Sequence, residues 1–552
     1  MKKPLRPIAY ALAGLSLLVG CSMTDSRTSA LRVAAVDDGT GASLGSVALP
    51  VVCGEDAMPH LDRGFALLHN MTYTEAETEF AVASERDPEC VLAPWGMAMS
   101  YVHPLWTDVP SDEALDRGMN LLVEARGLRE PSELEDAYLS ALEGYYRDGN
   151  GRSEVDRLAS YAAGWESAHL RDPDDLEAQL FRSLGMIAVA SLAQDQEASQ
   201  LEAGQLAEEV LAQVPDHTGA LHYIIHAYDL PKLADRALPA AKMYGEVAPE
   251  NSHALHMTSH IFTRVGLWEE SVSYNRRAAA AALANPINGS TSFQYMHAAD
   301  YLVYAFLQQL DDEAAQRVWD DMASLEGQVV DDPASAHAFA AVPARLALER
   351  QAWEQASSLR SEWPAYLAWS RYPNFVAISE FARGLGAARA GHSDAARTAL
   401  ARLRQLRDQA AALPGQYDWG IQVEIQEVTV RAWVAFEAGN DEEARSLMRR
   451  ASRLEASTEK HGITPGEVLP AAELLGDMLA EMGQYDEAIE AYESALGRSP
   501  NRLNSLYGAG LAAELNGDVS EARDYYARLV DGTLAGSAHP RIEHARRFLE
   551  GA

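Results

Sequence analysis

The sequence has 552 residues, of which 47% are hydrophobic and 23% charged, and its 81 acidic and 45 basic side chains give a formal net charge of −36. This apolar fraction excludes a disordered chain, and the length requires either several domains or one extended array. An acidic protein repels phosphate backbones, so we expect no nucleic-acid binding. Three cysteines exclude a disulfide-dense scaffold and a multi-cysteine metal framework.

The N-terminus has the pattern of a secretory signal peptide over residues 1–20. Three basic residues precede an apolar run at 8–19, and this run is shorter than the roughly 20 residues that the alternative, a transmembrane anchor, requires. The sequence at 18–21, Leu-Val-Gly-Cys, resembles a bacterial lipobox, which implies that Cys21 is lipidated and becomes the first mature residue. Because Ser22 follows it, we expect a lipoprotein of the bacterial cell envelope, anchored in the outer membrane and facing the periplasm.

Residues 21–51 are rich in Ser, Thr, Ala, Gly and Asp and lack helical periodicity. This composition predicts a flexible tether behind the lipidated cysteine. Export also places Cys53 and Cys90 in an oxidising compartment, where thiols tend to pair. We therefore predict a disulfide between them, with two buried thiols as the alternative.

From residue 57 onward the sequence has a helical pattern, with Gly and Pro mostly confined to short breaks. Small and aromatic residues recur at the spacing of the 34-residue tetratricopeptide repeat (TPR). The most regular copy comprises Ala472, Leu475, Gly476, Leu479, Tyr485, Ala488, Tyr492, Ala495 and Pro500, and the same spacing occurs at Gly64, Tyr73, Ala76, Phe80, Ala83 and Pro88. The pattern predicts an all-α, TPR-type α-solenoid, a right-handed superhelix with N-terminal repeats at 52–216, His-rich repeats at 217–345 and C-terminal repeats at 346–552.

Six of the 16 histidines lie between His222 and His297. His222 and His256 are 34 residues apart, as are His226 and His260, so each pair occupies the same place in neighbouring repeats. Their repeat positions face the concave groove of a TPR array. The predicted metal-ligating set is His222, His226, Asp229, His253, His256, His260, His297 and Asp300. Imidazoles with carboxylates suit a divalent transition metal, and the pattern does not distinguish Zn, Fe, Cu, Ni or Co.

Other interpretations of these residues stay open. A groove lined by His and Tyr could bind an envelope protein or peptide without metal, and buried histidines could be purely structural. A metalloenzyme is a further alternative, but the run from His222 to His226 lacks the Glu that a zincin uses as its base. No phosphate-binding loop or nucleophile elbow is present in the sequence, so we assign no catalytic residue. The aromatic segment 95–106 could extend the groove, although core packing is the favoured interpretation.

The chain resembles a family of bacterial secreted TPR proteins and lipoproteins over essentially its whole mature length. The matching segments are GALHYIIHAYD at 219–229, HALHMTSHIF at 253–262, DPEC at 87–90 before Trp95-Gly96, and 499–508. Thr258 departs from the family pattern, which usually has Pro there. The resemblance implies an exported solenoid and adds no activity.

Overall fold

The computed structural model describes residues 32–551, apart from residues 107, 108, 288, 326, 416 and 535. In this part of the chain a single two-stranded sheet precedes a long succession of helices. The predicted all-α, TPR-type solenoid is therefore confirmed. The predicted signal peptide at 1–20 and the lipidation site Cys21 lie outside the described residues. None of the helices described is both long and apolar enough to cross a lipid bilayer.

The elements follow one another in a regular order along the chain. Up to the last histidine-bearing helix they are β1 (Ala34–Asp37), β2 (Ser43–Val47), α1 (Met58–His69), α2 (Tyr73–Arg86), α3 (Leu92–Met99), α4 (Asp112–Leu128), α5 (Glu133–Tyr146), η1 (Gly149–Gly151), α6 (Glu154–Arg171), α7 (Leu176–Ala188), η2 (Ala190–Leu192), α8 (Gln196–Gln213), α9 (Thr218–Tyr228), α10 (Ala234–Val247), α11 (Ser252–Arg264), α12 (Trp268–Ala284) and α13 (Phe293–Gln309). They continue with α14 (Asp312–Ser324), α15 (Pro333–Leu348), α16 (Trp353–Ser357), η3 (Trp369–Arg371), α17 (Pro373–Arg389), α18 (Ser393–Ala410), α19 (Trp419–Glu437), α20 (Asp441–Ala456), α21 (Ala471–Glu481), α22 (Tyr485–Arg498), α23 (Leu503–Asn516), α24 (Val519–Asp531) and α25 (Pro540–Gly551).

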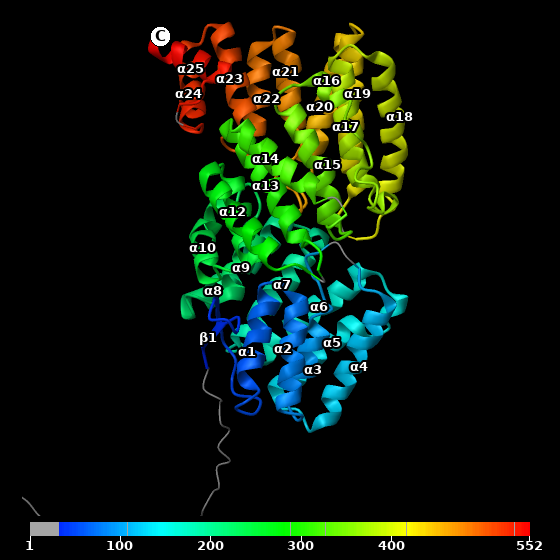
Figure 1. Ribbon diagram of the computed structural model, residues 1–552, viewed down its shortest axis with the longest axis vertical. Coiled ribbons are helices and arrows are strands. Elements are labelled where there is room, and N and C mark those ends of the chain that lie inside the picture. Colours follow the sequence, from blue (N-terminus) through cyan, green and yellow to red (C-terminus); the bar gives the residue numbers. More distant parts are fainter. Residues whose placement is uncertain are drawn as a thin grey trace, which may run out of the picture.

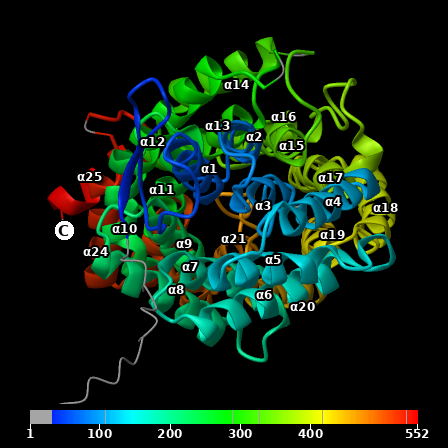
Figure 2. The same ribbon diagram turned by 90° about the horizontal axis from the view of Figure 1, so that it is seen from below.

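Most helices pack against the next one along the chain, so the fold grows as a stack of helix pairs. In Figure 1 the stack rises from the N-terminal helices at the bottom, through α8 to α14, to the C-terminal helices α21 to α25 at the top. Seen from below, the helices surround the middle of the molecule, and the chain that leads into α21 lies inside this ring (Figure 2). Segments far apart in sequence can therefore meet at the centre.

Two apolar cores meet at α11. One is built from residues 36–262 and the other from residues 255–545, and α11 contributes to both. Asn251 begins the helix by accepting a hydrogen bond from the Ala254 N–H (2.9 Å). Every residue from His253 to Arg264 is buried, so α11 has no solvent-facing stripe. Its polar side chains must find partners inside the protein.

The C-terminal helices pack back onto the central ones through buried polar residues. Arg502 is fully buried, and its Nε donates to Glu473 Oε2 (2.7 Å) while its Nη1 pairs with Glu349 Oε1 (2.8 Å). The Leu503 N–H donates to Gln308 Oε1 on α13 (3.0 Å). The inner face of the last repeats is thus partly occupied by the chain itself.

Part of the predicted tether at 21–51 belongs to the folded protein. Strands β1 and β2 pair antiparallel, and Val47 and Leu49 are fully buried. The Ser46 hydroxyl donates to Asp216 Oδ2 (2.8 Å), which fixes the hairpin beside α9. The strands have only four and five residues, and β2 contains Gly and Ser, so their alternation is too short to be recognised in the sequence.

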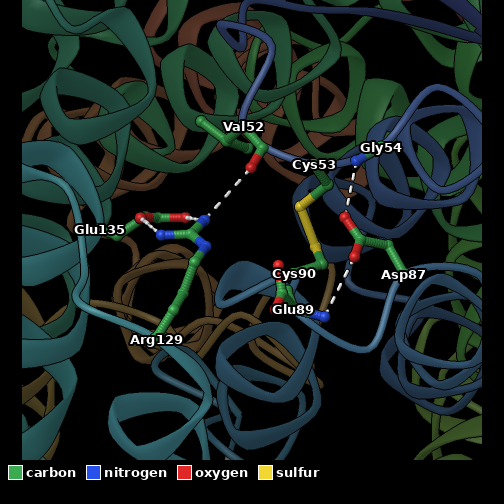
Figure 3. Close-up of a disulfide and its surroundings, with 8 residues drawn as sticks. All are labelled: Val52, Cys53, Gly54, Asp87, Glu89, Cys90, Arg129 and Glu135. Carbon is green, nitrogen blue, oxygen red and sulfur yellow. Dashed lines mark hydrogen bonds and ion pairs between the residues drawn. A yellow bond between two sulfur atoms is a disulfide. The ribbon is translucent and has the colours of Figure 1, made fainter.

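The structure joins the two cysteines for which we predicted a disulfide. The Cys53 and Cys90 sulfurs are bonded, with their Cα atoms 5.0 Å apart. Asp87 accepts hydrogen bonds from the Gly54 and Glu89 N–H groups beside the bridge (Figure 3). The disulfide fastens the segment that enters α1 to the turn between α2 and α3.

Candidate metal centre

The six clustered histidines form two groups of three, carried by α9, α11 and α13. The first triad is His222, His226 and His253, and the second triad is His256, His260 and His297. Within each triad one ligand atom of every residue lies within 4.8 Å of the others. The His226 and His260 ring centroids are 6.5 Å apart, so the triads are neighbours. The 34-residue spacing seen in the sequence thus brought equivalent histidines together.

The first triad contains three buried ring nitrogens without a hydrogen-bond partner. These are the Nε2 atoms of His222, His226 and His253. The Nδ1 of His222 donates to the His69 carbonyl (2.5 Å), and that of His253 faces Gln294 Oε1 (3.4 Å). Since a neutral imidazole carries one proton, these contacts place it on Nδ1 and leave a lone pair on Nε2. Unpartnered buried nitrogens are costly, and a metal ion would satisfy them.

In the second triad two lone pairs face each other. His256 Nδ1 donates to Asn275 Oδ1 (2.8 Å), and His260 Nδ1 donates to Asp229 Oδ2 (3.0 Å). Their Nε2 atoms are therefore unprotonated, yet they lie 3.0 Å apart. When two histidine nitrogens bind one ion with metal–nitrogen bonds of about 2.0–2.1 Å, the nitrogens lie roughly 3.0–3.4 Å from each other. The distance between the two Nε2 atoms therefore suits a shared metal ion. An extra proton between the rings would create a buried imidazolium, which burial opposes.

Burial keeps these imidazoles in the neutral, metal-binding form. It lowers the pKa of His253 to about 4 and lowers the pKa of His260 from its ordinary value. The pKa values of the other four, His222, His226, His256 and His297, lie well below the usual range, because neighbouring imidazoles add to the effect of burial. Neutral rings release no proton on binding a metal, which favours binding at neutral pH.

Asp229 orients a ligand and is not itself in either triad. Besides His260 it accepts hydrogen bonds from Arg264 Nε (2.7 Å) and Lys460 Nζ (3.1 Å). Burial alone would raise the pKa of Asp229, but the two cations and His260 outweigh it and hold the pKa well below its usual range. A carboxylate behind a histidine fixes the tautomer and the direction of the metal-binding nitrogen.

Asp300 belongs to neither triad. Its Oδ1 accepts from Arg345 Nε (3.0 Å), and its Oδ2 lies 3.5 Å from His337 Nδ1. We therefore leave Asp300 out of the site. Its spacing from His297 predicted a metal ligand, but Asp300 pairs with Arg345 on α15 instead. No local sequence pattern indicates that contact.

The concave groove expected around these residues is closed by the chain. The loop at 457–470, between α20 and α21, crosses it, and the Tyr301 hydroxyl donates to the Thr464 carbonyl (3.0 Å). Arg345 Nη2 donates to the Gly466 carbonyl (2.8 Å). His222 and Asp300 are fully buried. The site is a chamber and not an open groove, because a segment more than 150 residues away in sequence fills the opening.

One pocket connects the triads to the outside. Its cavity volume is about 110 Å³. It is lined by His226, His253, His260 and His297 together with Leu105, Trp106, Met257, Phe293, Gln294, Asp332, Pro333, Ala334, His461, Gly462 and Ile463. Trp95 is instead fully buried in the core, so the segment 95–106 contributes only its end to the pocket.

Sequence reasoning missed two sets of residues near the site. His461 lies in the closing loop and lines the pocket, and burial lowers its pKa to about 3. His69 and His217 flank the buried carboxylate of Glu177, at 2.6 Å and 3.2 Å, behind the first triad. A single histidine without repeat spacing carries no signal of a site, so neither set was recognisable before the fold was known.

A family model of the tetratricopeptide repeat matches residues 474–538, which include α22, α23 and α24. These residues form a tetratricopeptide-repeat array. Among solved structures, the chain is similar to the APC/C hetero-tetramer Cut9–Hcn1 (14% identity, TM-score 0.33, 90% of this chain and 89% of that one) and to yeast Tom70 (12% identity, TM-score 0.30, 90% and 95%). No curated protein matches the chain. TPR arrays present extended surfaces to other chains, so the fold favours an interaction scaffold.

Proposed function

We propose that this protein is a TPR-type interaction scaffold that binds divalent transition-metal ions in two histidine triads at its centre. The scaffold half is supported by the repeat match at 474–538 and is the better supported half. The metal half is carried by one observation: in the first triad three buried Nε2 atoms have no hydrogen-bond partner, and in the second the Nε2 atoms of His256 and His260, whose Nδ1 atoms have acceptors, lie 3.0 Å apart.

The donor set selects a class of ion. Nitrogen ligands suit Zn, Fe, Cu, Ni or Co, whereas Mg²⁺ and Ca²⁺ require oxygen ligands. Three protein ligands per ion also leave coordination positions open, as in metal sites that bind a further molecule. A metalloenzyme built on the same residues stays an alternative, and no catalytic residue is assigned.

Elemental analysis of the protein purified without a His-tag tests the metal half. We expect about two ions per chain, and loss of about one when His256 and His260 are both changed to Ala. His337→Ala is the matched control, because His337 is buried but lies outside both triads. Substoichiometric metal that is indifferent to the double substitution would contradict the proposal.

The second candidate is a metal-free scaffold that binds an envelope protein. The loop at 457–470 already fills the central groove, so its partner would bind the remaining surfaces of the array. This function predicts that one envelope protein co-purifies in defined ratio with both the parent chain and the His256→Ala/His260→Ala variant. If the His256→Ala/His260→Ala variant loses both the metal and the partner protein, partner binding depends on the metal.

We also propose a location in the bacterial cell envelope, with a lipid on Cys21. The proposal is supported by the lipobox-like sequence at 18–21 and by the Cys53–Cys90 disulfide, since structural disulfides typically form and persist in oxidising compartments. Metabolic labelling with a radioactive fatty acid should mark the parent chain. A Cys21→Ser variant that is labelled equally and stays in the membrane fraction would contradict it.

A further inference from the structure

The pocket beside the triads has two contrasting ends. Four metal-site histidines form one end, and Trp106, Phe293 and Ile463 belong to an apolar wall. We propose that this pocket binds a small organic carboxylate with an apolar body, whose carboxylate coordinates the metal and whose body lies on that wall. The inference rests on the metal site proposed above and names the ligand class of that site.

The charge balance of the chamber, with metal ions in the triads, favours an anionic ligand. Imidazole ligands are neutral, so a divalent ion in either triad keeps its full charge. Asp229 contacts the second triad, but Arg264 and Lys460 pair with it. One carboxylate, Asp332, lines the pocket and accepts the Ala334 N–H at the start of α15 (2.8 Å). It can offset at most one of the four positive charges that two divalent ions would bring. An uncompensated buried charge is costly, and an anionic ligand removes that cost.

The wall of the pocket recognises an apolar body. The Trp106 ring stands edge-on to the Phe293 ring, with centroids 5.0 Å apart, and lies 6.3 Å from the His253 ring. Met257 and Ile463 complete the apolar lining. The cavity volume of about 110 Å³ is close to the roughly 150 Å³ of an apolar cavity that holds one benzene ring, so the pocket suits a small body such as a single ring. A bare inorganic anion would leave this surface uncovered.

His461 offers a donor for a second polar group of the ligand. Its Nδ1 accepts the Ile463 N–H (3.1 Å), which places the proton of the neutral ring on Nε2. Gln294 adds an amide to the same pocket. The arrangement of a metal at one end, an apolar wall and separate donors is that of an organic-acid site.

The test uses the full chain loaded with Co²⁺ and three probes: benzoate, acetate and benzamide. Acetate has the charge without the apolar body, and benzamide has the body without the charge. Binding is measured by calorimetry and by the Co²⁺ visible absorption. We expect benzoate to bind at least about tenfold more tightly than either other probe, because burying a phenyl ring adds to coordination. Benzoate should also shift the Co²⁺ bands.

Two variants separate the parts of the proposal. Trp106→Leu should reduce benzoate affinity toward that of acetate with Co²⁺ content unchanged. Trp319→Leu, a half-buried tryptophan outside the pocket lining, is the matched control and should bind benzoate normally. Equal affinities for benzoate and acetate, or for benzoate and benzamide, overturn this inference alone. A chain that takes up no Co²⁺ in the triads overturns the proposed metal site as well, so the two failures are distinguishable.

Discussion

The C-terminal repeats and the histidine-bearing helices both bury polar side chains between packed helices, but they differ in how those side chains find hydrogen-bond partners. In the C-terminal repeats Gly476 and Gly508 leave room for the Tyr492 ring, whose hydroxyl donates to Asp477 Oδ1 (2.6 Å). The central helices α9 and α11 also bury histidine side chains, and the Nε2 atoms of several of these have no hydrogen-bond partner within the chain. The first arrangement is complete within the chain. In the proposed function a metal ion supplies the partner that the second lacks, so a repeat scaffold could gain a site without changing its fold.

Arg502 joins the two regions, and its loss should have the largest effect on stability. Arg502→Met leaves Glu349 and Glu473 as buried carboxylates without their cation. We expect the free energy of unfolding to fall by about 3–5 kcal/mol, with or without metal, in urea denaturation. Arg397→Met removes an exposed ion pair and should cost less than about 0.5 kcal/mol. If Arg502→Met lowers the free energy of unfolding no more than Arg397→Met does, the buried ion pairs of Arg502 do not hold the C-terminal repeats to the central helices.

Asp477 makes the C-terminal repeats sensitive to pH. Burial raises its pKa from 3.8 to about 7, so between these values the unfolded state binds fewer protons than the folded state. Stability therefore falls as pH rises through this window, by about 1.4 kcal/mol per pH unit. Asp477→Asn should remove that contribution, which amounts to about 2 kcal/mol between pH 5 and pH 7. Urea unfolding at pH 5, 6 and 7 measures it.

The exposed Asp524→Asn is the control for this prediction and should leave the pH dependence as it is in the parent chain. The Asp477 prediction fails if both variants lose stability with pH as steeply as the parent. It also fails if Asp477→Asn lowers stability at pH 7, since the neutral amide still offers an acceptor to Tyr492.

Asn275 should influence the metal without touching it. Its Oδ1 accepts from His256 Nδ1 and its Nδ2 donates to the Ser271 carbonyl (both 2.8 Å). Asn275→Leu removes the acceptor that fixes the His256 tautomer, so metal affinity should fall about 10–100-fold, or roughly 1.4–2.8 kcal/mol. Competition with a chromophoric chelator gives the affinity. Asn275→Asp keeps an acceptor and should retain most of the affinity, and equal losses in both variants would assign Asn275 a purely structural role.

The sequence was sufficient where local spacing determines structure. The 34-residue period identified the solenoid, and the pairs His222/His256 and His226/His260 identified a shared histidine cluster. Asp229 was found as well, but its role behind His260 depends on which nitrogen each ring presents. That information lies in hydrogen bonds to residues such as Asn275, which carry no signal of their own in the sequence.

Long-range closure could not be predicted. Lys460 meets Asp229 across 231 residues, and the loop that carries it converts the expected groove into a chamber. The position of His461 in the pocket follows from the same closure. A superhelix that encircles its own loop brings such segments together only after many repeats have stacked, so no window of sequence contains the contact.

The most direct test of the central claim is anomalous X-ray scattering from crystals of the untagged protein grown with Co²⁺ or Zn²⁺. The account predicts anomalous peaks inside the triads, each about 2.0–2.1 Å from histidine nitrogens, with Asp229 on the far side of His260. Metal found only on exposed carboxylates, with the His256 and His260 Nε2 atoms still 3.0 Å apart and no density between them, would contradict it.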